Sequence, residues 1–305
     1  MAQFQREGEE YAKNFPPVRV AIPLDPHRAV NDLLAMRIAT GGPAMAETID
    51  RWVAARGRRI LCRVHRPRTD RLLPVLMYFH GGGWVWSSID THDRLAREYA
   101  SAGGVAVVSV DYALSPEAKF PQALEECAAV TRYVSAHGAE WGLDPSALFV
   151  GGDSAGGNLA LATALLLRDT GGPALSGVVA VYPVCDSAMD TASYREFGTG
   201  CGLTHERMAF YWDVYESHAA DRHHPLAAPL RADLAGLPPV LVQLAELDVL
   251  RSEGEGLAAK LRAAGVTVEL EIFPGVLHGF MRAMATVGKA RDAVEKAGAF
   301  MRRAR

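Results

Sequence analysis

The chain has 305 residues, of which 49% are hydrophobic and 22% are charged, and its formal net charge is −3. This is the composition of an ordinary globular protein, so fibrous and disordered classes are excluded. The charge is too balanced to indicate nucleic acid or an anionic membrane surface as the main partner.

Short apolar runs alternate with longer segments of helical periodicity along most of the chain. We expect strands at residues 58–66, 74–80, 105–110, 148–151, 178–183, 240–245 and 267–273. Helical patterns lie at residues 90–102, 120–137, 155–169, 252–264 and 286–302. This alternation is typical of βαβ units, so the sequence predicts an α/β fold with a mostly parallel sheet covered by helices on both faces.

The strands differ in how their apolar residues are arranged. Residues 105–108 and 178–181 are continuously apolar, as expected for strands buried on both faces. Residues 266–272 instead alternate apolar and polar side chains, which indicates a wetter strand near an edge of the sheet. That edge offers a surface for pairing with a second copy, although Glu269 and Glu271 oppose it, and both a monomer and a homodimer remain open.

Two regions fall outside the alternating pattern. Residues 1–48 contain an amphipathic stretch at 30–39, and residues 186–236 form a long insertion with a helical pattern around 204–217. An insertion this long within a compact fold is usually functional. We therefore expect residues 1–48 and 186–236 to pack together as a helical cap on a core of residues 49–305. The alternative is that residues 1–30 are a frayed arm.

Three features of the sequence indicate where the protein is located: its cysteines, the start of the chain and its most apolar stretch. The four cysteines, Cys62, Cys127, Cys185 and Cys201, form no Cys-x-x-Cys pair, so we expect reduced thiols in a cytoplasmic protein. The start of the chain is acidic where a signal peptide is basic. The apolar stretch at residues 159–167 is about half as long as a membrane span, so no membrane partner is expected.

A Gly-x-Ser-x-Gly pattern occupies residues 152–156, between an apolar strand and a helical segment. A serine on such a sharp turn holds its oxygen clear of both elements, and glycines two residues away relieve the crowding. We therefore predict that Ser154 is a nucleophile; the alternative is a glycine-rich turn with an incidental serine.

A second glycine-rich segment, residues 80–83, follows another buried strand. Consecutive glycines allow backbone N–H groups to approach a ligand closely, as acyl transfer requires for its oxyanion. We expect Gly82, Gly83 and Ala155 to supply the oxyanion hole, with His80 stabilising the loop through a hydrogen bond. A flexible surface loop is the alternative.

The general base and its orienting acid should follow Ser154 along the chain. His278 lies just beyond the last strand, and Asp248 follows the strand before it, with Glu246 as its rival for the acid. Asp153 adjoins the nucleophile, but its side chain should point away. The pair His223 and His224 has no carboxylate or cysteine at ligand spacing, so no metal and no cofactor are expected.

With these motifs, the sequence resembles the hormone-sensitive-lipase branch of the α/β-hydrolases, and within it the bacterial acetyl esterases. The resemblance rests on separate motifs in order at residues 80–83, 111–117, 120–123, 152–157, 182–183 and 278–280. It implies an α/β-hydrolase fold, a Ser154–His278–Asp248 triad and a helical cap. The sequence departs from the family at Val249, where many members have proline, and at residues 113–115.

We therefore expect a carboxylic ester hydrolase that acts on small esters with short acyl groups through an acyl-enzyme. Trp84, Trp86 and Trp212 are candidate pocket aromatics, although tryptophan more often packs in a core or cap. One alternative is a non-catalytic binding protein on the same fold, and another is a hydrolase whose main substrate is an amide.

Overall fold

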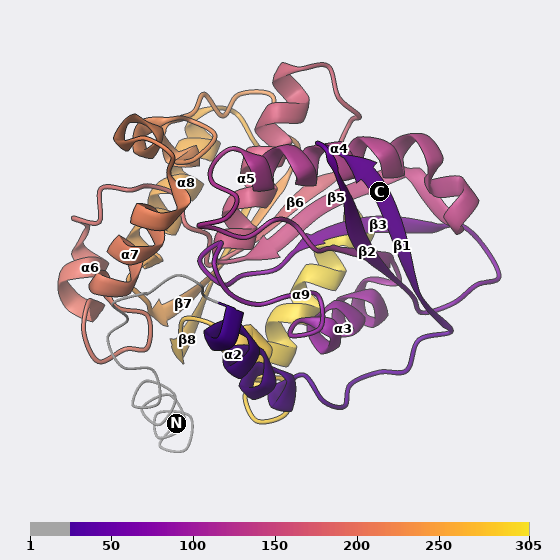
Figure 1. Ribbon diagram of the computed structural model, residues 1–305, viewed down its shortest axis with the longest axis horizontal. Coiled ribbons are helices and arrows are strands. Elements are labelled where there is room, and N and C mark those ends of the chain that lie inside the picture. The colour runs from indigo at the N-terminus through magenta and orange to yellow at the C-terminus, as the bar shows by residue number, and fades with distance from the viewer. Residues whose placement is uncertain (1–24, 305) are drawn as a thin grey trace.

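The computed structural model describes residues 25–304, and within them eight strands form one twisted sheet (Figure 1). Across the sheet the order is β1-β2-β4-β3-β5-β6-β7-β8. β1 and β2 run antiparallel to their neighbours, and the pairs from β4 to β8 are parallel, so the predicted mostly parallel sheet is confirmed. The strands are β1 (Glu47–Ala55), β2 (Arg58–Arg66), β3 (Leu73–Phe79), β4 (Ala106–Val110), β5 (Leu143–Asp153), β6 (Gly177–Val181), β7 (Val240–Leu247) and β8 (Val268–Leu277).

Helices cover both faces of this sheet, as the sequence predicts. α3 (Asp93–Gly103) and α9 (Gly288–Arg303) pack together on one face, around Tyr99 and Val294. α4 (Gln122–His137), α5 (Ala155–Asp169) and α8 (Arg251–Ala263) cover the other face, where Leu124, Leu159 and Leu257 join the larger core. Short 3-10 turns are η1 (Gly138–Trp141), η2 (Ala219–His223), η3 (Pro229–Arg231) and η4 (Phe280–Arg282).

The sequence predicts one of the two edge strands of the sheet and not the other. β8 lies at an edge, as its alternating pattern predicted. β1 lies at the opposite edge and was not predicted; it begins at Glu47, inside the segment assigned to the cap. Its side chains are mostly partly or fully exposed, with Val53 the buried one, so it lacks the apolar run that marks an inner strand.

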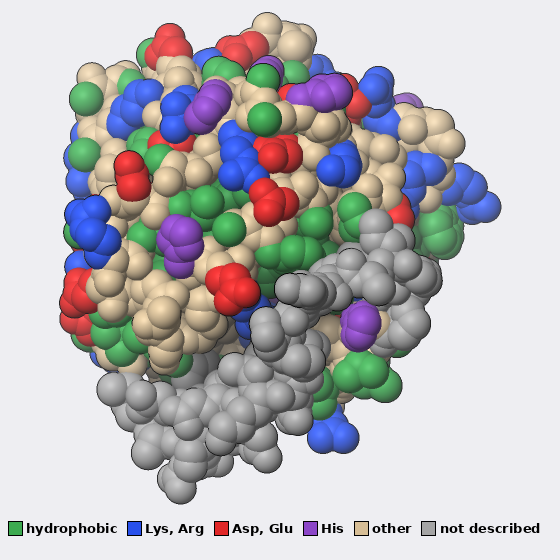
Figure 2. Space-filling view, turned by 60° about the vertical axis from the view of Figure 1, so that its left-hand side comes forward, with side chains coloured by type: hydrophobic (Ala, Val, Ile, Leu, Met, Phe, Trp, Pro, Cys, Tyr) green, Lys and Arg blue, Asp and Glu red, His purple; other side chains and the backbone are tan. Residues whose placement is uncertain are grey.

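The predicted cap pieces contain α2 (Asp25–Ile38), α6 (Ala192–Phe197) and α7 (His205–Tyr215). Figure 1 shows α6 and α7 together beyond the β7 and β8 side of the sheet, with α2 below them. The part of the cap segment before residue 25 lies outside the described residues. The face that carries α6 and α7 mixes acidic, basic and histidine side chains with small hydrophobic areas (Figure 2).

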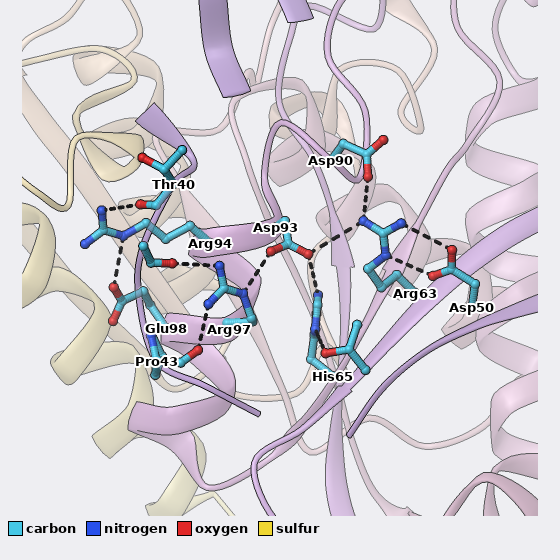
Figure 3. Close-up of polar contacts among 12 residues, drawn as sticks. Thr40, Pro43, Asp50, Arg63, His65, Asp90, Asp93, Arg94, Arg97 and Glu98 are labelled. Carbon is cyan, nitrogen blue, oxygen red and sulfur yellow. Dashed lines mark hydrogen bonds and ion pairs between the residues drawn. The ribbon is translucent and has the colours of Figure 1, made fainter. Parts of the chain in front are cut away.

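Arginine side chains attach α2 to the core at both ends. Arg28 donates to both carboxylate oxygens of Glu117, at 2.9 and 2.7 Å, and to two backbone carbonyls of the core. Beyond the helix, Arg94 donates to the carbonyl of Thr40, and Arg97 to the carbonyls of Gly41 and Pro43, at 2.7–2.8 Å (Figure 3). Charge-assisted hydrogen bonds of this kind fix the position of α2 without burying a large apolar surface.

The same network continues into the sheet (Figure 3). Asp93 accepts a hydrogen bond from Arg97 at 2.8 Å and lies 3.3 Å from the Nε2 atom of the buried His65. Arg63 pairs with Asp50 at 2.9 Å and Asp90 at 2.5 Å. The connection from α2 into β1 is therefore held against α3 and β2. No helix in residues 25–304 has the length and apolar character needed to cross a membrane.

Candidate active site

Ser154 occupies the turn between β5 and α5, with φ 58° and ψ −119°. Its N–H donates to the carbonyl oxygen of Val181 on β6, at 2.8 Å. A Cβ atom on Gly152 or Gly156 would lie 2.3 or 1.9 Å from the carbonyl oxygen of Phe79. Strand β3 therefore passes so close that only glycine fits at both positions, which explains the Gly-x-Ser-x-Gly spacing.

A continuous hydrogen-bond chain joins the serine to a histidine and a carboxylate. The Nε2 atom of His278 lies 2.9 Å from the Oγ atom of Ser154, and its Nδ1 atom lies 2.7 Å from Oδ2 of Asp248. The other oxygen of Asp248 accepts the N–H of Leu250 at 3.0 Å, and the carboxylate is 1% exposed. The Tyr182 ring packs 4.6 Å from the imidazole. The structure thus brings together the three side chains singled out in the sequence, each at or just beyond the end of a strand.

Glu246, the rival acid, lies elsewhere. Its Oε2 atom accepts a hydrogen bond from the N–H of Gly275, at 2.6 Å. Gly275 has φ 68°, in the left-handed region that favours glycine, and it lies three residues before His278. Glu246 therefore holds the backbone of the segment that carries the histidine, and makes no hydrogen bond with the imidazole itself.

Asp153 points away from the nucleophile, as expected, and toward the glycine-rich loop. Its Oδ1 atom accepts hydrogen bonds from the Tyr78 hydroxyl at 2.6 Å and from the N–H of Gly81 at 2.9 Å. Burial acts to raise the pKa of this carboxyl, but the charge of His92 and hydrogen bonds from His92 and Tyr78 outweigh it and hold the pKa well below its usual range. A permanently charged Asp153 therefore fixes the start of the loop.

The glycine-rich loop has the backbone that the sequence indicates. Gly82 has φ 128° and Gly83 has φ 62°. A Cβ atom on Gly82 would lie 2.1 Å from the carbonyl oxygen of Trp86, so only glycine allows this turn. Within the described part of the chain, the N–H groups of Gly82 and Gly83 donate to no other residue. Ala155 opens α5, where N–H groups have no partner inside the helix. These three donors are available to a developing oxyanion.

His80 is a structural part of this loop. Its Nδ1–H donates to the carbonyl of Gly81 at 2.9 Å, and the Tyr112 hydroxyl donates to the carbonyl of His80 at 2.6 Å. The Tyr112 ring stacks on the imidazole at 4.4 Å. Burial lowers the pKa of His80 to about 3, so the ring is neutral at physiological pH.

A cavity of about 540 Å³ opens in front of Ser154 and His278. Its walls come from the glycine-rich loop, the segment after His278, and both predicted cap pieces. From α2 the lining residues are Asn31, Leu34, Ala35, Arg37 and Ile38, and from α7 they are Arg207 and Tyr211. Segments far apart in the sequence therefore enclose one space beside the nucleophile.

Neither Trp84 nor Trp212 is among the described residues that line this cavity. Both are fully buried, and the Trp84 ring stacks on Tyr215 at 4.0 Å. Of the three candidate tryptophans only Trp86 is among the described lining residues, and Tyr211, which the sequence did not single out, lies there with it. A Cβ atom on Gly83 would lie 2.5 Å from the Tyr211 ring, so this ring packs directly on the glycine-rich loop. Adjacent positions on α7 face different ways, and the sequence pattern did not separate Tyr211 from Trp212.

The histidine pair and the cysteines have ordinary environments. His224 packs against Phe120, with 5.2 Å between ring centroids, and its Nδ1 atom accepts the N–H of Leu226. Across residues 25–304 no group of three or more His, Cys, Asp or Glu side chains is placed to hold a metal ion. The four cysteines are free thiols, and Cys201 is the one that is partly exposed.

Comparisons with known proteins agree with this architecture. A family model described as the alpha/beta hydrolase fold matches residues 76–282. Over 247 residues the chain is 39% identical to carboxylesterase NlhH of Mycobacterium tuberculosis, covering 79% of this chain and 77% of that protein. It is 35% identical to ethyl acetate hydrolase of Pseudomonas putida, covering 77% and 76%.

Among solved structures, a thermostable esterase from Pseudomonas putida ECU1011 superposes with a TM-score of 0.92 at 38% identity, covering 99% of this chain and 96% of that one. A similarity this extensive in both sequence and fold goes well beyond a shared architecture. The chain therefore belongs to the alpha/beta hydrolase family, in the hormone-sensitive-lipase-like branch that its sequence motifs predicted.

Proposed function

We propose that this protein hydrolyses short-acyl carboxylic esters through an acyl-enzyme on Ser154. The observation that carries the proposal is the hydrogen-bond chain from Ser154 Oγ through His278 to Asp248, at 2.9 and 2.7 Å, placed at the wall of a cavity. A nucleophile, its base and a group that orients the base are the parts that acyl transfer needs. The esterase names of the relatives and of the solved structure support the same reaction.

The reaction follows from these contacts. His278 Nε2 accepts the Ser154 proton as Oγ attacks the ester carbonyl, and the carbonyl oxygen becomes an oxyanion held by the N–H groups of Gly82, Gly83 and Ala155. The C–O bond to the alcohol then breaks, and His278 returns the proton to the departing alcohol. Water attacks the acyl-enzyme in the same way, giving the carboxylic acid and free Ser154. Asp248 holds the imidazole tautomer with Nδ1–H and stabilises the imidazolium.

The cap assignment is part of the proposal. Residues 1–48 and 186–236 would act as a cap on the core, because α2 and α7 both contribute walls to the cavity. A cavity of about 540 Å³ bounded on these sides limits the space for an acyl chain. Against this, α2 exposes apolar side chains at Val30, Leu33 and Met36, a surface on which a long-chain substrate could lie.

The acyl-chain dependence of kcat/KM tests the proposal. We expect 4-nitrophenyl acetate through hexanoate to be the best substrates in a series kept below aggregation, with longer chains slower because the cavity wall excludes them. A rate that climbs steadily through decanoate and beyond would show that each added methylene finds apolar surface, at ~0.8 kcal/mol each, and would make the protein a lipase. No turnover of any ester would point to a binding protein, and faster cleavage of a matched anilide would point to an amidase.

A further inference from the structure

The cavity beside Ser154 has an unusual charge for a site that would take neutral esters. Apart from His92 and His278, the charged side chains among the described residues that line it are four arginines and one aspartate: Arg37, Arg94, Arg207, Arg282 and Asp153. The arginines come from the last turn of α2, the first turn of α3, the first turn of α7 and the last residue of η4, and Asp153 is the last residue of β5. The chain as a whole is slightly acidic, so this concentration of positive charge is local.

Three of these five residues, Arg94, Arg207 and Asp153, already interact with other groups of the protein. Arg94 donates to the carbonyl of Thr40 at 2.8 Å and to Glu98 at 3.2 Å, and Figure 3 shows its guanidinium turned to both. Asp153 accepts hydrogen bonds from Tyr78 and Gly81, as described above. The lining arginine closest in sequence to the catalytic histidine is Arg282, four residues after His278.

Arg282 is half-buried, and among residues 25–304 its guanidinium forms no hydrogen bond or ion pair. Its positive charge nevertheless reaches the site, because it contributes to lowering the pKa of Asp153 and of His80. Asp32 on α2 also faces it, and there burial raises the pKa of the carboxyl. A half-buried guanidinium with free donors beside a reactive serine is suited to a planar anion, because it offers paired N–H groups in a geometry that matches a carboxylate.

We propose that the preferred substrates are short esters that carry a carboxylate, and that Arg282 pairs with this carboxylate inside the cavity. Arg37 adds positive charge at another part of the same wall. Such a field raises the local concentration of anionic substrates and favours their productive orientation. This inference rests on the proposed ester hydrolysis and specifies its substrate class.

Pairs of matched esters test the inference on the unmodified protein. On the alcohol side, 4-acetoxybenzoate is compared with 4-acetoxybenzamide; on the acyl side, monoethyl succinate is compared with ethyl butyrate. Each ratio of kcat/KM, anionic over neutral, is corrected for the reactivity of the two esters toward hydroxide. We expect a ratio of roughly ten or more in at least one pair at low ionic strength, decreasing in 0.5 M salt because salt screens the attraction.

The outcomes separate this inference from the function on which it rests. A corrected ratio below two in both pairs, with clear turnover of the neutral esters, overturns the inference and leaves ester hydrolysis intact. Absence of turnover for all four esters overturns ester hydrolysis itself. A preference for the anion that does not weaken with salt contradicts an electrostatic origin and overturns the role of the arginine.

Substitutions test whether Arg282 is the residue that pairs with the substrate carboxylate. Arg282→Met should reduce the anionic-over-neutral ratio by roughly tenfold, mainly through KM, and Arg282→Lys should retain part of it because the charge remains. The matched control is Arg262→Met, which removes an exposed arginine of α8 outside the cavity and should leave the ratio unchanged. An unchanged ratio in Arg282→Met contradicts the assignment. If that variant does not fold, a ratio in Arg282→Lys equal to wild type with no salt dependence contradicts it equally.

Discussion

The carboxyl edge of the sheet and the cap pieces above it are built in different ways. At the edge, Ser154, Asp248 and His278 each follow a strand, and backbone hydrogen bonds such as Ser154 N–H to Val181 fix their positions. α2 is instead attached through side chains, with Arg28 and Arg97 reaching the backbone and carboxylates of other segments. The strand ends therefore fix the Ser154–His278–Asp248 chain through the backbone, whereas α2, attached through side chains, contributes to the cavity wall.

The largest expected effect is at the edge of the sheet. Ser154→Ala should fold normally, because the Ser154 side chain is not part of either hydrophobic core cluster. The variant should lose at least ~10⁴-fold in kcat/KM on 4-nitrophenyl acetate. Circular dichroism and thermal unfolding check the fold, and initial rates check the activity. Retention of even a tenth of the wild-type rate would show that the sheet edge does not carry the chemistry.

The next prediction separates two carboxylates two residues apart at the end of β7. Asp248→Asn should reduce kcat by ~10³–10⁴-fold, because an amide favours the wrong imidazole tautomer. Glu246→Gln keeps an oxygen that can accept the N–H of Gly275 and should lose less than about tenfold. The reverse ranking of the two variants in kcat/KM would move the orienting role to Glu246.

A smaller effect, on the pH dependence of stability, is expected at Glu253, which contacts the chain where the 186–236 insertion begins. The buried carboxylate of Glu253 on α8 accepts the N–H groups of Cys185 and Asp186, at 2.9 and 3.0 Å. Burial raises its pKa to about 8. In the unfolded chain the group titrates near 4.3, so between these values the folded state holds a proton that the unfolded state does not, and the free energy of unfolding decreases as pH rises.

Glu253→Gln should remove this dependence, which is at most ~1.4 kcal/mol per pH unit for one proton. Thermal unfolding at pH 5, 6, 7 and 8 measures it, with Glu255→Gln on the same helix as the control. We expect the stability of Glu253→Gln relative to wild type to rise over this range. Parallel curves for wild type and Glu253→Gln would show that the cap connection is not coupled to this carboxyl.

Much of the edge could be predicted from the sequence because its signals are local. An inner strand needs a continuous apolar run, and a serine on a strand-to-helix turn needs glycines two residues away, so residues 148–157 predict both the strand and the position of Ser154 on the turn after it. The alternating pattern of residues 266–272 likewise predicts an edge strand, and β8 lies at an edge. These features depend on a few neighbouring residues and on the regular geometry of parallel strands.

The cavity walls could not be predicted in this way, because they depend on packing between segments distant in the sequence. Trp84, Trp86 and Trp212 look alike along the chain, and only the tertiary structure places Trp86 at the cavity, beside Tyr211, and leaves Trp84 and Trp212 fully buried away from it. The edge strand β1 carries too few apolar residues to show a strand pattern. The arrival of arginines from four elements at one cavity has no signal along the chain.

Covalent labelling of the nucleophile tests the central claim most directly. A dialkyl 4-nitrophenyl phosphate phosphorylates a serine only where a base and an oxyanion hole activate it. We predict that one equivalent of label is incorporated in step with the loss of esterase activity, that peptide mass spectrometry finds it on Ser154, and that Ser154→Ala takes up none. Complete inactivation with the label on another residue, or full esterase activity with Ser154 labelled, would contradict the account.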